Sequence, residues 1–443
     1  MNSSLIAQGY MGRSLTIACK VNLPVHKGSM SATCLAHTVI LLIFLSLAGC
    51  ATPPAQMESM DYRARAETRV EGGVSVSAVV LSPRETEHRF DIPLAKKGIQ
   101  PIWIEIDNQE DREFFLMLLS VDPEYFSPSE VAWMFRHQGD ESLEDRIDML
   151  VNRHIPLIIP AHGKVSGYVY TNLDPGAKAY AVEMFTEQDL LSFEFIQIVP
   201  GFEADFMRVR FEQLYPENEV QDLTLSQLRE YLETLPCCVA GGNRKTPGDP
   251  LNLVIVGGGR HLLATFVRRG WDLTETMRGE TVWRTVASSL FRSLYRTSPV
   301  SPLYLFDRKQ DFALQKTRGT VHERNHLRLW LAPITLAGRN VWVGQISRDI
   351  GIKPVSNTMV THKIDPLVDE ARLYLTLDAL GANALQAIGY VKGVGSSTRE
   401  APRYNYTKDP YYTDGLRVVL ILAEERQLID SIEYLPWEQV IQP

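Results

Sequence analysis

Cysteine is scarce in this sequence. The chain has 443 residues and five cysteines, two of which, Cys237 and Cys238, are adjacent. Disulfide-rich scaffolds join several well-separated cysteine pairs, so the sequence excludes this class of fold. Two neighbouring cysteines are most often an ordinary loop or helix-end sequence, and a vicinal disulfide is the alternative interpretation.

Acidic residues are missing from the first 49 positions, where Arg13, Lys20 and Lys27 supply three positive charges. Without this segment the net charge of the chain changes from −8 to −11. An acidic chain is repelled by the phosphates of nucleic acids and by anionic membrane surfaces. The composition therefore predicts no nucleic-acid partner and no general adsorption to an anionic membrane.

The apolar run at residues 39–49 is too short to cross a membrane, because a transmembrane helix needs roughly 20 apolar residues. The run follows the basic residues and ends in Leu47-Ala48-Gly49-Cys50, the pattern of a lipoprotein signal peptide with its lipobox. We therefore expect cleavage before Cys50, acylation of this cysteine and anchoring to the membrane by the acyl chains. Ala51, in the place of a retaining aspartate, favours the outer membrane of a bacterial envelope, on the side that faces the periplasm.

Residues 50–71 are polar and contain Pro53 and Pro54, as expected for a tether between the acylated cysteine and the first domain. From Gly72 onward, polar and apolar residues alternate with the period of β-strands, and turn residues separate the segments. This pattern predicts a β-sandwich over residues 72–212 with a helical insert at 127–151. The alternating segments are 74–80, 101–107, 164–171, 179–185 and 193–200.

Leucines at 225, 228, 232 and 235 share one face of a predicted linker helix within residues 213–248. Residues 249–424 then mix apolar strands with amphipathic helices, and residues 425–443 form a tail. The predicted fold class is α+β, with the N-terminal β-sandwich followed by a C-terminal mixed α+β domain. Strands are expected at 251–256, 326–331, 340–346, 385–391 and 416–422, and helices at 262–267, 283–294 and 365–380.

Several separated motifs lie between residues 250 and 424. They make this segment similar to the LssY C-terminal domain family, a bacterial domain found in envelope proteins. The resemblance implies work at a membrane, because other members join this domain to membrane phosphatase-like or DedA-like segments. This chain has neither segment, so no activity of those partners carries over to it. The motifs are Gly270-Trp271, Ser301-Pro-Leu-Tyr-Leu-Phe-Asp-Arg-Lys-Gln-Asp311, Arg324-Asn-His-Leu-Arg-Leu-Trp330, Val341-Trp-Val-Gly-Gln-Ile-Ser-Arg-Asp349 and Thr361-His-Lys-Ile-Asp-Pro-Leu-Val-Asp-Glu-Ala-Arg372.

Two short patterns imitate known sites. His322-Glu-Arg-Asn-His326 matches the H-E-x-x-H pattern of zinc peptidases, which needs both histidines on one helical face. The strand-like alternation from His326 instead favours one histidine in a loop and the other in a strand. Val254-Ile-Val-Gly-Gly-Gly-Arg resembles a dinucleotide fingerprint, but Leu262 replaces its third glycine, which favours a tight strand-to-helix turn.

Polar residues from the separate motifs form the candidate site. Histidines with carboxylates could bind a divalent metal and activate water. Arginines with histidines could instead bind a phosphate or carboxylate, because guanidinium groups pair bidentately with such anions. The third interpretation is purely structural, with Asp365 as a helix N-cap and Asp369 and Arg372 as a helix-surface pair. The candidate residues are Arg308, Asp311, His326, Arg328, Asp349, His362, Asp365, Asp369 and Arg372.

The sequence favours a lipid-anchored binding or assembly module of the cell envelope over an enzyme. Its expected partners are the membrane, through Cys50, and envelope proteins or lipids. The alternative is a hydrolase that acts on envelope phosphates or lipids through His326 and His362, with or without a metal. The sequence does not identify a cofactor.

Overall fold

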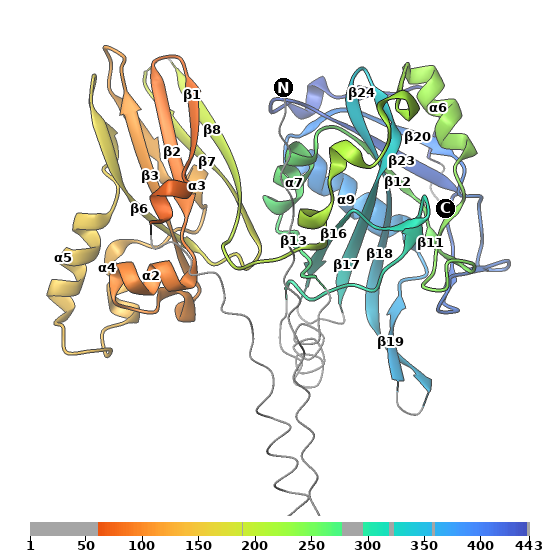
Figure 1. Ribbon diagram of the computed structural model, residues 1–443, viewed down its shortest axis with the longest axis horizontal. Coiled ribbons are helices and arrows are strands. Elements are labelled where there is room, and N and C mark those ends of the chain that lie inside the picture. Colours follow the sequence, from red (N-terminus) through yellow and green to blue (C-terminus); the bar gives the residue numbers. More distant parts are fainter. Residues whose placement is uncertain (1–60, 188, 277–295, 319–322, 357–358, 441–443) are drawn as a thin grey trace, which may run out of the picture. The chain divides into compact units, whose positions relative to one another are not determined.

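The computed structural model describes residues 61–187, 189–276, 296–318, 323–356 and 359–440 (Figure 1). The predicted signal peptide, Cys50, His322 and the helix expected at 283–294 lie outside these residues. Among the described helices, none is long and apolar enough to cross a membrane.

The N-terminal region contains two four-stranded sheets, with strand orders β1-β2-β3-β6 and β5-β4-β7-β8. Their facing sides share one apolar core, to which β2, β3, β4, β7 and β8 all contribute, so the predicted strand-rich region is present. The strands are β1 Glu67–Glu71, β2 Val74–Val80, β3 Ile99–Asn108, β4 Phe114–Met117, β5 Ile158–Ile159, β6 Lys164–Asn172, β7 Ala177–Phe185 and β8 Leu190–Ile198.

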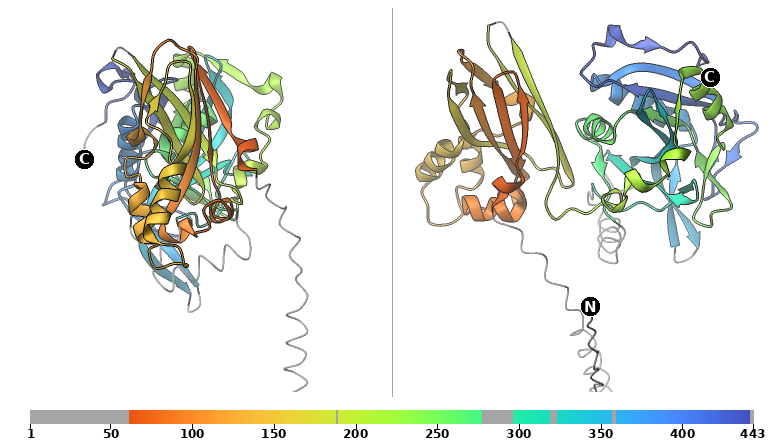
Figure 2. Two further views of the ribbon diagram at one scale, coloured as in Figure 1. Left: turned by 90° about the vertical axis from the view of Figure 1, so that its left-hand side faces the viewer. Right: turned by 45° about the horizontal axis from the view of Figure 1, so that its top comes forward.

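Helices cover the outer side of the first sheet (Figures 1 and 2). Trp103 and Tyr170 of that sheet pack there against Phe90, Phe135 and other helical side chains. Both faces of β3 are consequently buried from Ile99 to Ile104, a stretch in which Gln100 is the one polar side chain. The helices of this region are α2 Pro83–Phe90, α3 Leu118–Val121, α4 Pro128–Met134 and α5 Leu143–Arg153.

The C-terminal region is built on a mixed sheet whose main path runs β13-β16-β17-β18-β12-β23-β20-β24 in the described chain. In addition, β19 pairs with β18 and β9 pairs with β17. The fold class is therefore α+β, as the sequence predicts. The strands are β9 Gln221–Leu223, β12 Leu253–Val256, β13 Asp272–Leu273, β16 Phe312–Thr317, β17 Arg324–Leu336, β18 Arg339–Ser356, β19 Met359–Ile364, β20 Leu385–Lys392, β23 Leu416–Leu422 and β24 Glu433–Tyr434.

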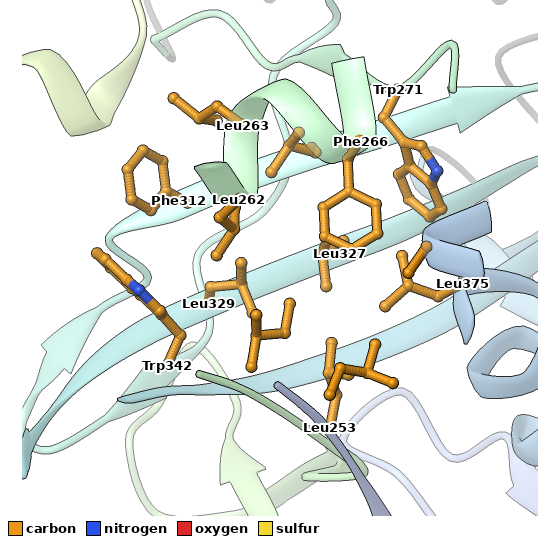
Figure 3. Close-up of a cluster of buried hydrophobic side chains, with 14 of the residues drawn as sticks. Leu253, Leu262, Leu263, Phe266, Trp271, Phe312, Leu327, Leu329, Trp342 and Leu375 are labelled. Carbon is orange, nitrogen blue, oxygen red and sulfur yellow. The ribbon is translucent and has the colours of Figure 1, made fainter. Parts of the chain in front are cut away.

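Each face of this sheet has its own helices. On one face, α7 (Gly259–Val267) and α9 (Val368–Gly381) pack through Leu262, Phe266 and Leu375 against strand residues such as Leu327 (Figure 3). On the other face, α6 (Leu225–Thr234) contributes Leu228 and Leu232 to a separate apolar cluster. The helix expected between the two domains thus packs on the C-terminal sheet, and the predicted tail supplies the edge strand β24.

Smaller elements complete the fold. Cys237 and Cys238 are joined in a disulfide, the alternative that the sequence favoured less. The short strands are β10 Cys238–Ala240, β11 Pro247–Pro250, β14 Tyr304–Leu305, β15 Arg308–Lys309, β21 Arg403–Tyr404 and β22 Pro410–Tyr411, and the 3-10 turns are Tyr62–Arg65, Leu94–Lys97, Asp205–Arg208, Phe211–Gln213, Glu217–Glu219 and Ile429–Ser431.

Arg417 of β23 is fully buried and is neutralised by backbone oxygens rather than by an acid. Its guanidinium donates to six carbonyl groups at distances between 2.6 and 3.2 Å. Gly393 is required beside it, because a Cβ atom at this position would lie 1.8 Å from the guanidinium. The carbonyls belong to Leu232, Leu235, Pro236, Leu251, Lys392 and Gly393.

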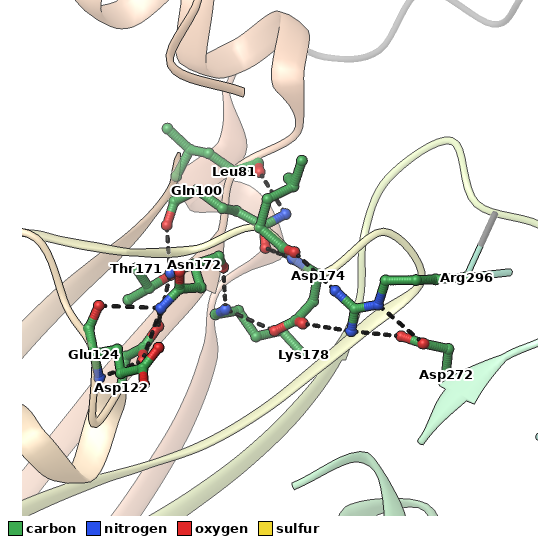
Figure 4. A network of polar contacts seen from close by, with 11 residues as sticks. Leu81, Gln100, Asp122, Glu124, Thr171, Asn172, Asp174, Lys178, Asp272 and Arg296 are labelled. Atoms are coloured by element: carbon green, nitrogen blue, oxygen red, sulfur yellow. Dashed lines mark hydrogen bonds and ion pairs between the residues drawn. The ribbon is translucent and has the colours of Figure 1, made fainter. Parts of the chain in front are cut away.

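A second arginine, Arg296, bridges two carboxylates at the β13 end of the sheet (Figure 4). Its Nη2 atom lies 2.7 Å from Asp272 Oδ1 and 3.3 Å from Asp174 Oδ1. Asp174 also accepts a hydrogen bond from Lys178. This network is structural, since each charge in it has a partner of opposite sign.

Candidate functional site

The face of β17 and β18 that carries α6 changes character along its length. Near the hairpin turn it is apolar, with Trp330 and Val343 in the cluster shared with α6. Toward the start of β17 and the middle of β18, the same side carries Arg324, His326 and Arg328 opposite Gln345, Ser347 and Asp349. Because side chains of a strand alternate between faces, residues two apart necessarily share this polar stretch. All six of these side chains are buried.

Two histidines, His326 of β17 and His362 of β19, converge on the carboxylate of Asp349 in β18. His326 Nε2 lies 2.6 Å from Asp349 Oδ2, and His362 Nδ1 lies 3.2 Å from the same oxygen. Arg324 Nε donates to His326 Nε2 at 3.1 Å. We call Arg324, His326, Arg328, Asp349 and His362 the Asp349 cluster.

Burial shifts the titration of this cluster. It raises the pKa of Asp349 to about 6, against the opposing effect of His362, Arg324 and Arg328. Burial, reinforced by Arg324 and Arg328, lowers the pKa of His326 well below its ordinary value, so this imidazole is neutral. The pKa of Arg324 falls to about 10, mainly because of burial. A neutral imidazole has two tautomers. A protonated Nε2 can donate to Asp349 and an unprotonated Nε2 can accept from Arg324, so these two contacts belong to different tautomers.

The cluster is incompletely hydrogen-bonded among the described residues. His326 Nδ1 and Arg328 Nε are buried and have no hydrogen-bond partner. Arg328 Nη1 donates to Gln345 Oε1 at 3.0 Å, and Gln345 in turn donates to the buried Asp249. Buried polar groups normally find partners, so two such atoms on neighbouring side chains mark an unusual place in the fold.

A cavity of about 310 Å³ opens beside this cluster, at the end of β16, the start of β17 and the middle of β18. Arg324 and Asp349 form part of its wall, and Tyr374 of α9 closes another part. Among its described lining residues, four are cationic and two are acidic. The cations are Lys316, Arg318, Arg324 and Arg348, and the acids are Glu323 and Asp349.

The cations of the cavity differ in how far they are already neutralised. Lys316 Nζ lies 2.9 Å from Asp378, which satisfies its charge. Arg348 donates to the neutral amide of Asn325 at 3.1 Å, and its nearest carboxylate, Asp365, is 4.0 Å away. No ion pair of Arg318 occurs within the described residues. Arg318 and Arg348 therefore remain available to an anion.

The nine predicted site residues do not converge. Four of them, His326, Arg328, Asp349 and His362, lie in the Asp349 cluster. Asp365 lies nearby, where its Oδ1 accepts from the backbone of Leu367 at 3.0 Å. The predicted N-cap role of Asp365 needs correction, because α9 begins at Val368 with Leu367 in the cap position.

The other four predicted residues form separate ion pairs. Arg308 of β15 binds Asp311 through two contacts of 2.9 and 3.0 Å. Arg372 is buried and binds Asp414 at 2.6 Å, with Asp369 3.4 Å away, so the expected helix-surface pair is an interior one. For these four residues the geometry supports the structural interpretation.

The zinc-peptidase pattern and the dinucleotide-fingerprint pattern can both be compared with the structure. His326 lies in β17, as the alternation predicts, and the described part of the zinc-peptidase pattern is therefore extended rather than helical. The three glycines after β12 form a turn in which Gly258 caps α7, as the strand-to-helix interpretation predicts. Among the described residues, no group of three or more His, Cys, Asp or Glu side chains has the geometry to hold a metal ion.

Sequence reasoning missed several residues of this region. Arg324 and Arg348 belong to the motifs given above but not to the predicted site. Lys316, Arg318 and Tyr374 belong neither to the motifs nor to the predicted site. The period-two spacing of Arg324, His326 and Arg328 could have placed Arg324 on the same strand face. The position of α9 over the strand ends has no comparable local signal.

The comparisons with known proteins concern the same part of the chain. No curated protein matches the sequence. A family model described as the LssY C-terminus matches residues 229–416, a segment that contains α6, the Asp349 cluster and the cavity. Residues 229–416 are thus an LssY C-terminus domain, as the sequence motifs indicate.

Proposed function

We propose that this protein is a lipid-anchored binding or assembly module of the bacterial cell envelope. In this proposal its LssY C-terminus domain binds an anionic group, a phosphate or a carboxylate, in the cavity beside the Asp349 cluster. The lipid anchor and the envelope location rest on the signal sequence that ends at Cys50. The binding role rests on the cavity.

The observation that carries the binding role is the excess of unneutralised cations in the cavity. Arg318 has no ion pair among the described residues, and Arg348 has only the 4.0 Å contact with Asp365. A guanidinium group offers parallel N–H donors that match phosphate and carboxylate oxygens. Arg324 adds a third guanidinium in the same wall, and its burial fixes its position.

Thermal unfolding with inorganic phosphate and with citrate tests this role. The fragment Ser59–Pro443 is suited to the measurement, because it forms one compact unit. A ligand at 100 times its Kd stabilises a protein by about 2.7 kcal/mol, which gives a clear increase in Tm. We expect Arg348→Gln to abolish this increase.

Arg339→Gln is the matched control, since Arg339 lies at the other end of β18 and also binds a side-chain amide, that of Gln386, at 2.8 Å. The control should keep the anion-dependent increase in Tm. Equal loss in both variants, or no increase in the unmodified fragment, would disprove the anion site.

The anchor is tested separately by Cys50→Ala in the full chain. This variant cannot be acylated at position 50 and should leave the membrane fraction. Retention in the membrane with residues 1–49 still attached would contradict the proposed anchor.

The convergence of His326 and His362 on Asp349 favours one second candidate, a hydrolase of envelope phosphates or lipids. Histidine and carboxylate side chains at hydrogen-bond distance can transfer protons to and from a substrate. A stoichiometric transition metal in the purified protein that is lost in His326→Ala would support a metal-dependent form of this candidate.

A further inference from the structure

An apolar stripe borders the cavity on helix α9. Leu373 and Leu377 are 47% and 54% exposed. The other two leucines of this helix differ, since Leu375 is buried and Leu380 is half-buried. Residues 373, 374 and 377 project within about 100° of one another around a helix axis. Tyr374, at one edge of this arc, lines the cavity. The stripe and the cavity therefore share an edge.

Ile350 extends the apolar surface across the cavity mouth. It lines the cavity from β18 and is 44% exposed. The aromatic ring of Tyr374 lies beneath two of the cations, with Lys316 Nζ 5.0 Å and Arg348 Cζ 5.5 Å from its centroid. A ligand that entered the cavity would thus meet cations inside it and exposed aliphatic side chains at its mouth.

We infer that the ligand is a lipid with an anionic phosphate headgroup, whose phosphate enters the cavity while its acyl chains lie over Leu373, Leu377 and Ile350. This inference rests on the proposed anion site and specifies its ligand. The cations match the phosphate in charge and donor geometry. The exposed leucines and isoleucine match the acyl chains, because burying such apolar surface is favourable.

The acidity of the whole chain is compatible with this ligand. Glu323 and Glu370 are exposed close to the cavity and the stripe, so bulk attraction to an anionic bilayer is weak. Capture of one headgroup instead depends on short-range contacts inside the cavity. We therefore expect recognition of individual lipid molecules rather than charge-driven adsorption to vesicles.

Short-chain lipids allow the headgroup and the acyl chains to be tested separately. The fragment Ser59–Pro443 is titrated with glycerol 3-phosphate and with dihexanoyl phosphatidic acid below its critical micelle concentration, and Kd is measured by calorimetry. We expect the lipid to bind at least tenfold more tightly than glycerol 3-phosphate. The double variant L373S/L377S should lose this tenfold difference and retain the affinity for glycerol 3-phosphate.

The double variant L428S/I429S is the matched control, because Leu428 and Ile429 are also neighbouring exposed aliphatic residues and lie outside α9. It should keep the tenfold difference. Binding of glycerol 3-phosphate without a gain from acyl chains would overturn the lipid inference and leave the anion site standing. A gain that survives in L373S/L377S would overturn the placement of the acyl chains. Absence of binding by both compounds would overturn the proposed function itself.

Discussion

The two ends of one sheet face in the C-terminal domain carry opposite chemistry. Near the β17–β18 turn, Trp330 and Val343 are buried among apolar side chains. At the other end, His326 and Asp349 are buried equally well, yet they are surrounded by arginines and amides. Backbone pairing continues through both ends, so strand geometry does not require the change. A buried polar end costs stability that the apolar end supplies, which is typical of a site kept for binding.

The apolar end should show the largest loss of stability on mutation. Trp330→Ala removes a fully buried indole and is expected to lower the free energy of unfolding by about 3–5 kcal/mol. Urea unfolding of the fragment Ser59–Pro443 measures this loss. Trp133→Ala on α4 is the control, since Trp133 is 57% exposed, and a surface substitution should change stability by no more than about 0.5 kcal/mol. Similar losses in the two variants would contradict the assignment of this end as the packed core.

The contribution of the polar end to the free energy of unfolding should depend on pH. The folded-state pKa of Asp349 is about 6, above its ordinary value of 3.8, so the folded state binds a proton more readily between these values. Its contribution to stability is therefore present at low pH and is lost as the pH rises through about 6. Asp349→Asn mimics the neutral carboxyl and lacks this dependence. Between pH 4 and pH 7, wild type should lose up to about 3 kcal/mol relative to this variant.

Unfolding free energies of both proteins across this pH range measure the effect. The comparison cancels the titration of groups remote from Asp349. It does not cancel that of His326, which lies 2.6 Å from Asp349 Oδ2 and whose lowered pKa acts in the opposite direction below pH 6.5. A difference between wild type and Asp349→Asn that stays constant with pH would show that Asp349 is ionised throughout.

The smallest effect is expected from Ser347→Ala, which makes the polar end slightly more apolar. Ser347 Oγ lies 3.4 Å from Asp249 Oδ2, a long contact, and its loss should cost about 1 kcal/mol or less. The same urea unfolding measures this cost, which should be greater where Asp249 is ionised, because the hydrogen bond from Ser347 lowers the pKa of that carboxyl. A loss near that of Trp330→Ala would mean that the polar end contributes as much to stability as the apolar end.

Local patterns in the sequence predict most of the elements. The period-two segments at 74–80 and 179–185 lie within β2 and β7, and the leucine spacing at 225–235 corresponds to α6. The sequence does not predict the order of strands in the C-terminal sheet. Its central strand β12 pairs with β18 and, in parallel, with β23, and such long-range pairing leaves no local signature.

The candidate site was predictable only where its residues share one strand or adjacent strands. His326 and Arg328 lie on β17, and Asp349 lies on the neighbouring strand β18, so they meet. Arg308 and Arg372 are also charged residues of the motifs, but each is paired with a nearby aspartate and lies apart from the cluster. Spacing along the chain could not distinguish these ion pairs from a site, because their partners are set by tertiary packing.

The C-terminal domain cannot finish folding until Arg417 has been synthesised, because the carbonyl groups around it converge on its guanidinium. Arg417 reaches Leu251 and Leu232 across 166 and 185 residues of sequence. It belongs to β23, the strand that also covers one edge of β12. Closing such long loops is slow, and unpaired apolar strand edges associate with other chains. A growing chain therefore carries β12 with one edge unpaired until residue 417 has been made, and during this interval it is most vulnerable to aggregation.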